Sequence, residues 1–170
     1  MMKRIIALCT AAVLCLSLLS ACASKSEGGS DPGGSVDLAA FAQTLQEDHE
    51  FPMLERNDPA DELGAAMLDN YYAGLKDMDL EQIEVYLAAI SFSSAELALV
   101  EAKSGEDVSR VKEIFQARID SKTVEGPGNY PEEVEMWQHN ARVADHGMYV
   151  MLVCHEDSQA IVDQFNALFS

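Results

Sequence analysis

Positive charge is scarce in this chain. Its 170 residues include 11 Lys and Arg against 29 Asp and Glu, which gives a formal charge of −18. A protein that binds nucleic acid needs clustered cations to neutralise phosphates, and here the few cations are scattered singly between acids. The composition therefore excludes nucleic acid as an expected partner. Hydrophobic residues make up 48% of the chain, which is enough apolar surface for a folded core.

Cysteines and the familiar catalytic motifs are also few. The chain contains four cysteines, Cys9, Cys15, Cys22 and Cys154, and the first three lie close to the N-terminus. If the first three are removed or modified, a single thiol remains and no internal disulfide can form, so the apolar core must hold the fold. The sequence has no HExxH, CxxC, nucleophile elbow or glycine-rich phosphate loop. Enzymatic activity is not indicated, and no cofactor is expected.

The first 22 residues have the pattern of an export signal. Met1–Arg4 is cationic, and the uncharged stretch Ile5–Leu19 is too short to span a membrane permanently. Leu19-Ser20-Ala21-Cys22 resembles the bacterial lipobox. The resemblance implies that residues 1–21 are a lipoprotein signal peptide and that Cys22 carries a thioether-linked diacylglycerol. We therefore expect a cell-membrane protein, lipid-anchored on the extracytoplasmic side, with the bilayer as a partner through acylated Cys22. The alternative is an ordinary secretory signal with an incidental Cys22.

A tether and one acidic domain are predicted to follow the signal. Residues 22–36 are rich in Gly and Ser without apolar periodicity, which is typical of a flexible segment with a mean reach of roughly 20 Å. The mature chain would have 9 cationic and 29 anionic side chains, a formal charge of −20. Because bacterial membrane surfaces are usually anionic as well, we expect residues 37–170 to stand off from the bilayer.

Hydrophobic periodicity predicts an α+β domain. Two N-terminal helices precede the order ββα(α)ββα, which predicts a four-stranded antiparallel sheet with packed helices. Residues 37–74 would be an N-terminal helical cover and residues 79–170 the core. The predicted elements are helices at 37–48 and 61–74, strands at 83–92 and 95–103, a helix from 106, a short helix at 131–139, a hairpin at 141–154 that turns at 145–147, and a final helix capped by Asp157.

Two details of these elements bear on packing. The second helix is predicted to bury Leu63, Met67, Leu68 and Tyr71 on one face and to end at Gly74. The strand at 149–154 is apolar on both faces, so each face must be covered. We expect the helices that follow the two hairpins to cover one face, and the N-terminal pair of helices or a partner protein to cover the other.

Two aromatic residues are candidates for contact with a partner or ligand. Tyr130 lies in a Gly/Pro loop, where it either contacts a ligand or pins the loop to the core. Trp137 is the only tryptophan, and an exposed tryptophan could stack on a sugar. Its spacing from Val134 and Ala141 instead favours packing in the core.

His139, Cys154 and His155 could instead form a metal site or a reactive-thiol site. If His146 and Gly147 form a two-residue turn, Cys154 lies opposite His139, and His155 is close to both. Against this site, Cys154 shares a strand face with apolar residues, and a buried thiol is usually inert. His49 lies in an acidic stretch and is expected to be solvated.

Residues 79–169 resemble a family of small, uncharacterised lipoproteins from clostridial Gram-positive bacteria, catalogued as a domain of unknown function. The resemblance is carried by Ser94-Ala95-Glu96, by the helix of Arg118, by Tyr130-Pro131 and by Gly147-Met148-Tyr149. It implies a lipoprotein and this fold class, and it supplies no catalytic residues. The expected function is a membrane-anchored, non-enzymatic binding or accessory module for an unknown envelope protein or ligand. The alternative is a small envelope hydrolase or metal-binding protein that uses His139, Cys154 and His155.

Overall fold

The computed structural model describes residues 35–89, 93–124 and 130–170. The predicted signal peptide, Cys22 and most of the predicted tether lie outside the described residues. Within them the elements, in chain order, are α1 (Leu38–Asp48), β1 (Leu54–Arg56), α2 (Glu62–Tyr71), β2 (Leu80–Ala88), β3 (Glu96–Ala102), α3 (Gly105–Lys122), α4 (Pro131–Asn140), β4 (Ala141–His146), β5 (Tyr149–Cys154) and α5 (Ser158–Ala167).

A single antiparallel sheet lies at the centre of the described residues. Its five strands have the order β1-β2-β3-β5-β4. The predicted mixture of helices with an antiparallel sheet is confirmed, but the predicted number of four strands is wrong. The additional strand, β1, pairs with the end of β2 through three residues. Arg56 of β1 holds it there, because its Nε and one terminal nitrogen donate to the Glu84 carboxylate of β2 at 2.7 and 2.9 Å.

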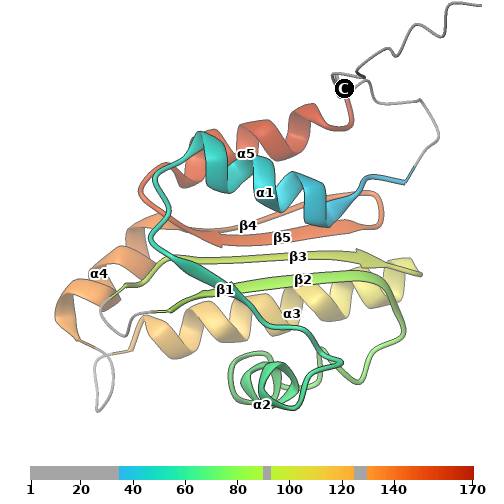
Figure 1. Cartoon of the computed structure of the whole chain (residues 1–170), viewed down its shortest axis with the longest axis horizontal. Helices are drawn as coiled ribbons and strands as arrows, with labels where there is room; N and C mark the ends of the chain where they lie inside the picture. Colours follow the sequence, from blue (N-terminus) through green and yellow to red (C-terminus); the bar gives the residue numbers. More distant parts are fainter. Residues whose placement is uncertain (1–34, 90–92, 125–129) are drawn as a thin grey trace, which may run out of the picture.

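Helices cover both faces of the sheet (Figure 1). On one face α1 and α5 bury an apolar cluster of Leu38, Phe41, Ala42, Leu45, Leu97, Leu99, Met151, Val153, Ile161 and Phe165. On the other face lie α2, α3 and α4. The two N-terminal helices are therefore on opposite faces, and the expectation that they cover one face together is wrong. The apolar character of β5 on both sides is explained by these two helical layers.

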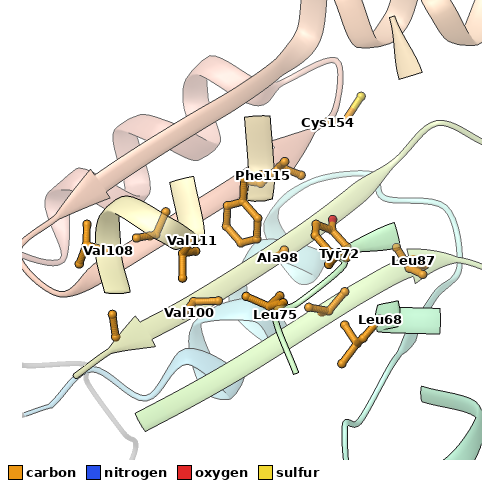
Figure 2. Close-up of a cluster of buried hydrophobic side chains, with 14 of the residues drawn as sticks. Leu68, Tyr72, Leu75, Leu87, Ala98, Val100, Val108, Val111, Phe115 and Cys154 are labelled. Atoms are coloured by element: carbon orange, nitrogen blue, oxygen red, sulfur yellow. The ribbon is translucent and has the colours of Figure 1, made fainter. Parts of the chain in front are cut away.

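The larger cluster fills the space between the sheet and α3 (Figure 2). Val111 and Phe115 of α3 point toward Ala98 and Val100 of β3, and all four side chains are buried. Tyr72 packs edge-on against Phe115, with ring centroids 5.6 Å apart. Each large apolar side chain buried in this way contributes about 1.5–3 kcal/mol to stability.

The second helix is shorter and turned differently from the prediction. It ends at Tyr71, before Gly74, whose φ of +90° belongs to the following turn. Gly64 lies so close to the preceding loop that a Cβ there would be 2.1 Å from the Asp58 carbonyl oxygen. This contact directs the Gly64 side of the helix inward and leaves Leu63 73% exposed. The helix buries Gly64 and Leu68, and the chain beyond its end buries Tyr72 and Leu75; the side chains of Leu68, Tyr72 and Leu75 are labelled in Figure 2.

The hairpin of β4 and β5 turns one residue later than predicted. His146 pairs with Tyr149, so Gly147 and Met148 form the turn, and Gly147 has the positive φ of +60° that suits glycine. This register places Cys154 opposite Ala141. The predicted pairing of Cys154 with His139 is therefore wrong.

Candidate functional site

A cavity of about 960 Å³ opens at one end of the sheet. It lies where α1 ends, where α4 and α5 begin, and where β3 starts and β5 finishes. We call it the acidic pocket. Its lining residues are Asp48, Glu50, Pro52, Ser93, Ser94, Ala95, Tyr130, Pro131, Glu132, Glu133, Met136, Cys154, His155, Glu156 and Asp157.

The charge of this lining is entirely negative. It includes six carboxylates and no Lys or Arg among the described residues. Glu132 and Glu133 occupy the first turn of α4, where the positive end of the helix dipole stabilises them. Asp48 is instead in the last turn of α1, which contains no basic residue, and a carboxylate is disfavoured at that end of a helix. The helix dipole therefore explains the acidic residues at the start of α4, but it does not explain Asp48.

Two histidines connect the end of α1 to the start of α5. The Nδ1 of His155 accepts from the backbone N–H of Asp157 at 3.0 Å, and its ring packs 4.3 Å from that of Phe51. The Nδ1 of His49 lies 3.1 Å from the Asp157 carboxylate. The His49 side chain is only 9% exposed, so the expectation that it is solvated is wrong. The acidic stretch that contains His49 packs against α5, which its composition did not indicate.

A buried ion pair lies behind the pocket and was not predicted. Two nitrogens of Arg118 donate to the Glu96 carboxylate at 2.9 and 2.7 Å, and the Tyr72 hydroxyl donates to the same carboxylate. Glu96 is 4% exposed and Arg118 is 8% exposed. Burial lowers the pKa of Arg118, but the bonds and the charge of Glu96 outweigh it and raise the pKa overall. Burial, followed by the charge of Glu96, raises the pKa of Tyr72 well above its ordinary value.

A signal for this pair was present in the sequence. Arg118 follows Val111 and Phe115 at helical spacing, and Glu96 stands at the start of the apolar run of β3. A cation on one apolar stripe and an anion on another predict a buried pair once the two elements pack together. Both side chains are buried, so neither reaches solvent at the edge of its stripe.

The thiol of Cys154 lies at the wall of the pocket, paired in register with Glu96 on β3. Burial and then the negative charge of Glu96 raise the pKa of Cys154 to about 12. The thiolate is the reactive form of cysteine. A neutral, buried thiol is therefore inert at physiological pH.

The three residues of the candidate metal site do not come together. His139 is exposed in the last turn of α4, Cys154 faces α3, and His155 turns toward Phe51 and the end of α1. Across residues 35–89, 93–124 and 130–170, no group of three His, Cys, Asp or Glu side chains could hold a metal ion. The same residues contain no helix that is long and apolar enough to cross a bilayer.

The two aromatic candidates have different environments. Trp137 is 1% exposed, and the Arg118 guanidinium lies 5.3 Å from its ring centroid. It is a core residue, as its spacing favoured. Tyr130 is 62% exposed and lines the acidic pocket at the start of α4. Tyr130 therefore stays available to a ligand, whereas Trp137 does not.

Comparison with known proteins places this chain in a family. Residues 55–155 match the domain of unknown function DUF4358, which is more than half of the chain. The chain belongs to the DUF4358 family. No curated protein and no solved structure is significantly similar to it. The expected membership of a family of unknown function is confirmed, but the match covers residues 55–155 rather than the predicted 79–169.

The DUF4358 match covers the sheet and the helices on one of its faces, but not the helices on the other face. It runs from within β1 to the residue after β5, and so contains the sheet with α2, α3 and α4. Helices α1 and α5, which form the layer on the other face, lie outside it. The acidic pocket is built from both parts, because the DUF4358 segment supplies 93–95, 130–133, Met136, Cys154 and His155, and the flanks supply the rest.

Proposed function

We propose that this DUF4358 protein is an extracytoplasmic lipoprotein, anchored through acylated Cys22, whose domain is a non-enzymatic binding module with the acidic pocket as its binding site. The lipobox resemblance of Leu19–Cys22 and the predicted tether support the anchor. The sequence has none of the catalytic motifs named above. His139, Cys154 and His155, the candidates for metal or thiol chemistry, lie apart from one another.

The observation that carries the binding role is the lining of the pocket. Six carboxylates surround a cavity of about 960 Å³ that contains no cationic side chain among the described residues. Two of the six are paired with side chains nearby: Glu133 lies 3.8 Å from Lys122, and Asp157 lies 3.1 Å from His49. The remaining carboxylates have no ion pair among the described residues.

The apolar part of the lining narrows the class of ligand. Pro52, Met136 and the exposed ring of Tyr130 provide apolar surface beside the carboxylates. A Lys or Arg side chain is complementary to this lining, because its stem is apolar and its head is positively charged. Complementary charge also favours the encounter with a basic partner. The pocket therefore suits a basic segment of an envelope protein.

The binding role can be tested by capture from detergent-solubilised membranes with the acylated protein as bait. The variant Glu50→Gln/Glu156→Gln removes two charges from the pocket, and Glu55→Gln/Glu113→Gln removes two exposed charges elsewhere. A partner of the pocket is expected to be retained by wild type and by the control, and to bind the pocket variant at least about fivefold more weakly, equivalent to about 1 kcal/mol. If all three baits retain the same proteins equally, the pocket is not the binding site.

The anchor is tested separately with Cys22→Ala. Without the acylated cysteine, the protein is expected to remain an unprocessed precursor or to be released into the medium. Detergent phase partition measures this. A Cys22→Ala protein that stays membrane-associated at its mature mass would contradict the lipid anchor.

A further inference from the structure

The N-terminal end of the described chain is held at one particular place on the domain. The backbone N–H of Val36 donates to the Tyr149 hydroxyl at 3.1 Å, and its carbonyl accepts from the Gln82 amide at 2.7 Å. The oxygen of the same amide accepts from the backbone N–H of Leu38 at 3.0 Å. Glu101 extends this network, because its carboxylate accepts from both Tyr149 and Ser35 at 2.8 and 3.1 Å. The predicted tether therefore leaves the domain where β2 and β5 begin and β3 ends.

The acidic pocket is at the opposite end of the same elements. Strand β5 starts at Tyr149, which binds Val36, and finishes at Cys154, which lines the pocket. Its six residues span about 17 Å at the rise of an extended strand. Helix α1 runs in the same direction over 11 residues, or about 16 Å, from the tether end to Asp48 in the pocket. Figure 1 shows α1 starting beside the β4–β5 turn and α4 lying at the far end of the sheet.

Both ends of the domain are acidic, because the tether end also carries exposed carboxylates at Asp37, Asp79 and Glu81. At the tether end Lys103 pairs with Asp79 at 2.5 Å, and Lys112 pairs with Asp145 at 2.6 Å. The pocket end has six carboxylates and no Lys or Arg in its lining. An anionic membrane surface therefore repels both ends within a Debye length of about 8 Å at physiological salt, and the attachment point of the tether decides which end lies nearer the bilayer.

We propose that the tether holds the acidic pocket on the side of the domain that faces away from the membrane, so that the pocket receives its basic partner from the outer side. This inference rests on the proposed function, because it requires the lipid anchor at Cys22. It excludes the headgroups of the protein's own bilayer as the ligand of the pocket. It also narrows the class of partner, since a basic segment lying at the bilayer surface could not reach the pocket, whereas one that projects well above the surface could.

The orientation can be measured with the full acylated protein in vesicles of anionic phosphatidylglycerol that contain a headgroup-labelled quencher lipid. One fluorophore is attached at Met148→Cys in the β4–β5 turn, and in a second protein it is attached at Glu135→Cys on α4. Both positions are exposed, and neither lines the pocket. The buried thiol of Cys154 stays unlabelled. The end of the domain that joins the tether stays nearer the bilayer, and the other end lies about 17 Å away along the strands, a distance similar to the mean reach of the tether. Quenching at Met148→Cys is therefore expected to exceed quenching at Glu135→Cys at least about twofold.

Two controls separate the possible failures. Flotation with the vesicles reports the anchor: protein that does not float overturns both the proposed lipoprotein function and the orientation. Protein that floats but shows equal quenching at the two positions, or stronger quenching at Glu135→Cys, overturns the orientation alone. In zwitterionic vesicles the twofold contrast is expected to persist, because it comes from the point at which the tether leaves the domain, and its loss there would overturn the orientation by the tether.

Discussion

Replacing Glu96 with Gln should destabilise the domain far more than the loss of one negative charge on so acidic a protein would suggest. The change keeps the size of the side chain but removes the counter-charge of Arg118, which is only 8% exposed. It also weakens both charge-assisted bonds to Arg118 and the bond from Tyr72. Removing one partner of a buried ion pair costs about 3–5 kcal/mol, because the other charge stays buried without compensation.

At about 3–4 °C of melting temperature per kcal/mol for a domain of this size, that cost corresponds to a fall of about 10–20 °C. Urea denaturation gives the free energy of unfolding directly, and an unchanged m-value would show that the unfolding transition is the same. The matched control is Asp145→Asn, which breaks an ion pair with Lys112 whose side chains are 44% and 39% exposed. This exposed pair should contribute no more than about 1 kcal/mol.

A double variant distinguishes the charge effect from simple disruption of packing. In Glu96→Leu/Arg118→Met the uncompensated charge disappears, so the stability should recover to within about 1–3 kcal/mol of wild type, the remaining cost being that of the Tyr72 hydroxyl left without its acceptor. If Glu96→Gln costs no more than Asp145→Asn, the pair is not buried in solution and the reasoning is wrong.

Three further predictions concern the buried thiol, the packing of the N-terminal helices and metal binding. The pKa of Cys154 is raised in the folded state from its ordinary value of 9.0 to about 12, so the thiol stabilises the fold fully below pH 9 and this contribution is lost as the pH rises toward 12. Between pH 9 and 11 the free energy of unfolding should therefore fall more steeply for wild type than for Cys154→Ala, by at most about 1.4 kcal/mol per pH unit. Equal slopes would contradict the burial of the thiol. Leu45→Ala, at a fully buried position of α1, should cost about 2–5 kcal/mol in a urea titration, whereas Leu63→Ala, at a position of α2 that is 73% exposed, should stay within about 0.5 kcal/mol. Similar costs would refute the assigned packing of α2. A chelator should leave the melting temperature unchanged, since a structural metal at 100 times its dissociation constant would contribute about 2.7 kcal/mol, and a loss of several degrees would reveal one.

The helices with a strong apolar stripe were predictable from the sequence. The first helix was predicted at 37–48 with Asp37 as its cap, and the side chain of Asp37 does accept from the backbone N–H of Ala40. The helix from 106 and the one capped by Asp157 were also found, within a residue at their starts. Periodicity is informative in these segments because one face of each is buried along its whole length.

The errors in the fold come from segments where local pattern does not determine the outcome. Strand β1 is three residues long and follows Pro52, so it exists through pairing with β2 and the Arg56–Glu84 contact rather than through its own alternation. The rotation of α2 depends on the approach of Gly64 to Asp58, a contact between backbones that hydrophobic spacing does not encode. The hairpin turn was misplaced by one residue, because both His146-Gly147 and Gly147-Met148 are compatible with a two-residue loop.

The candidate site was largely beyond the reach of sequence reasoning. Its lining comes from four separate stretches near residues 50, 94, 132 and 155, which only the strand order β3-β5 and the packing of three helix ends bring together. Acidic residues are so abundant in the chain that the six at the pocket carried no signal. Tyr130 was singled out for its Gly/Pro loop, and it is the one aromatic candidate that lines the pocket.

The layer formed by α1 and α5 has a consequence for how the chain folds. These are the first and last helices of the described chain, and the bonds between them join residues far apart in sequence: His49 meets Asp157 across 108 positions, and Asp48 meets Gln164 across 116. Bringing such distant segments together costs loop-closure entropy before any contact compensates it, and contacts of this kind slow folding. A chain that emerges N-terminus first must therefore carry the apolar stripe of α1 without its helical neighbour until α5 is available. During that interval part of one face of the sheet lacks its cover, and transiently exposed apolar surface of this kind favours aggregation.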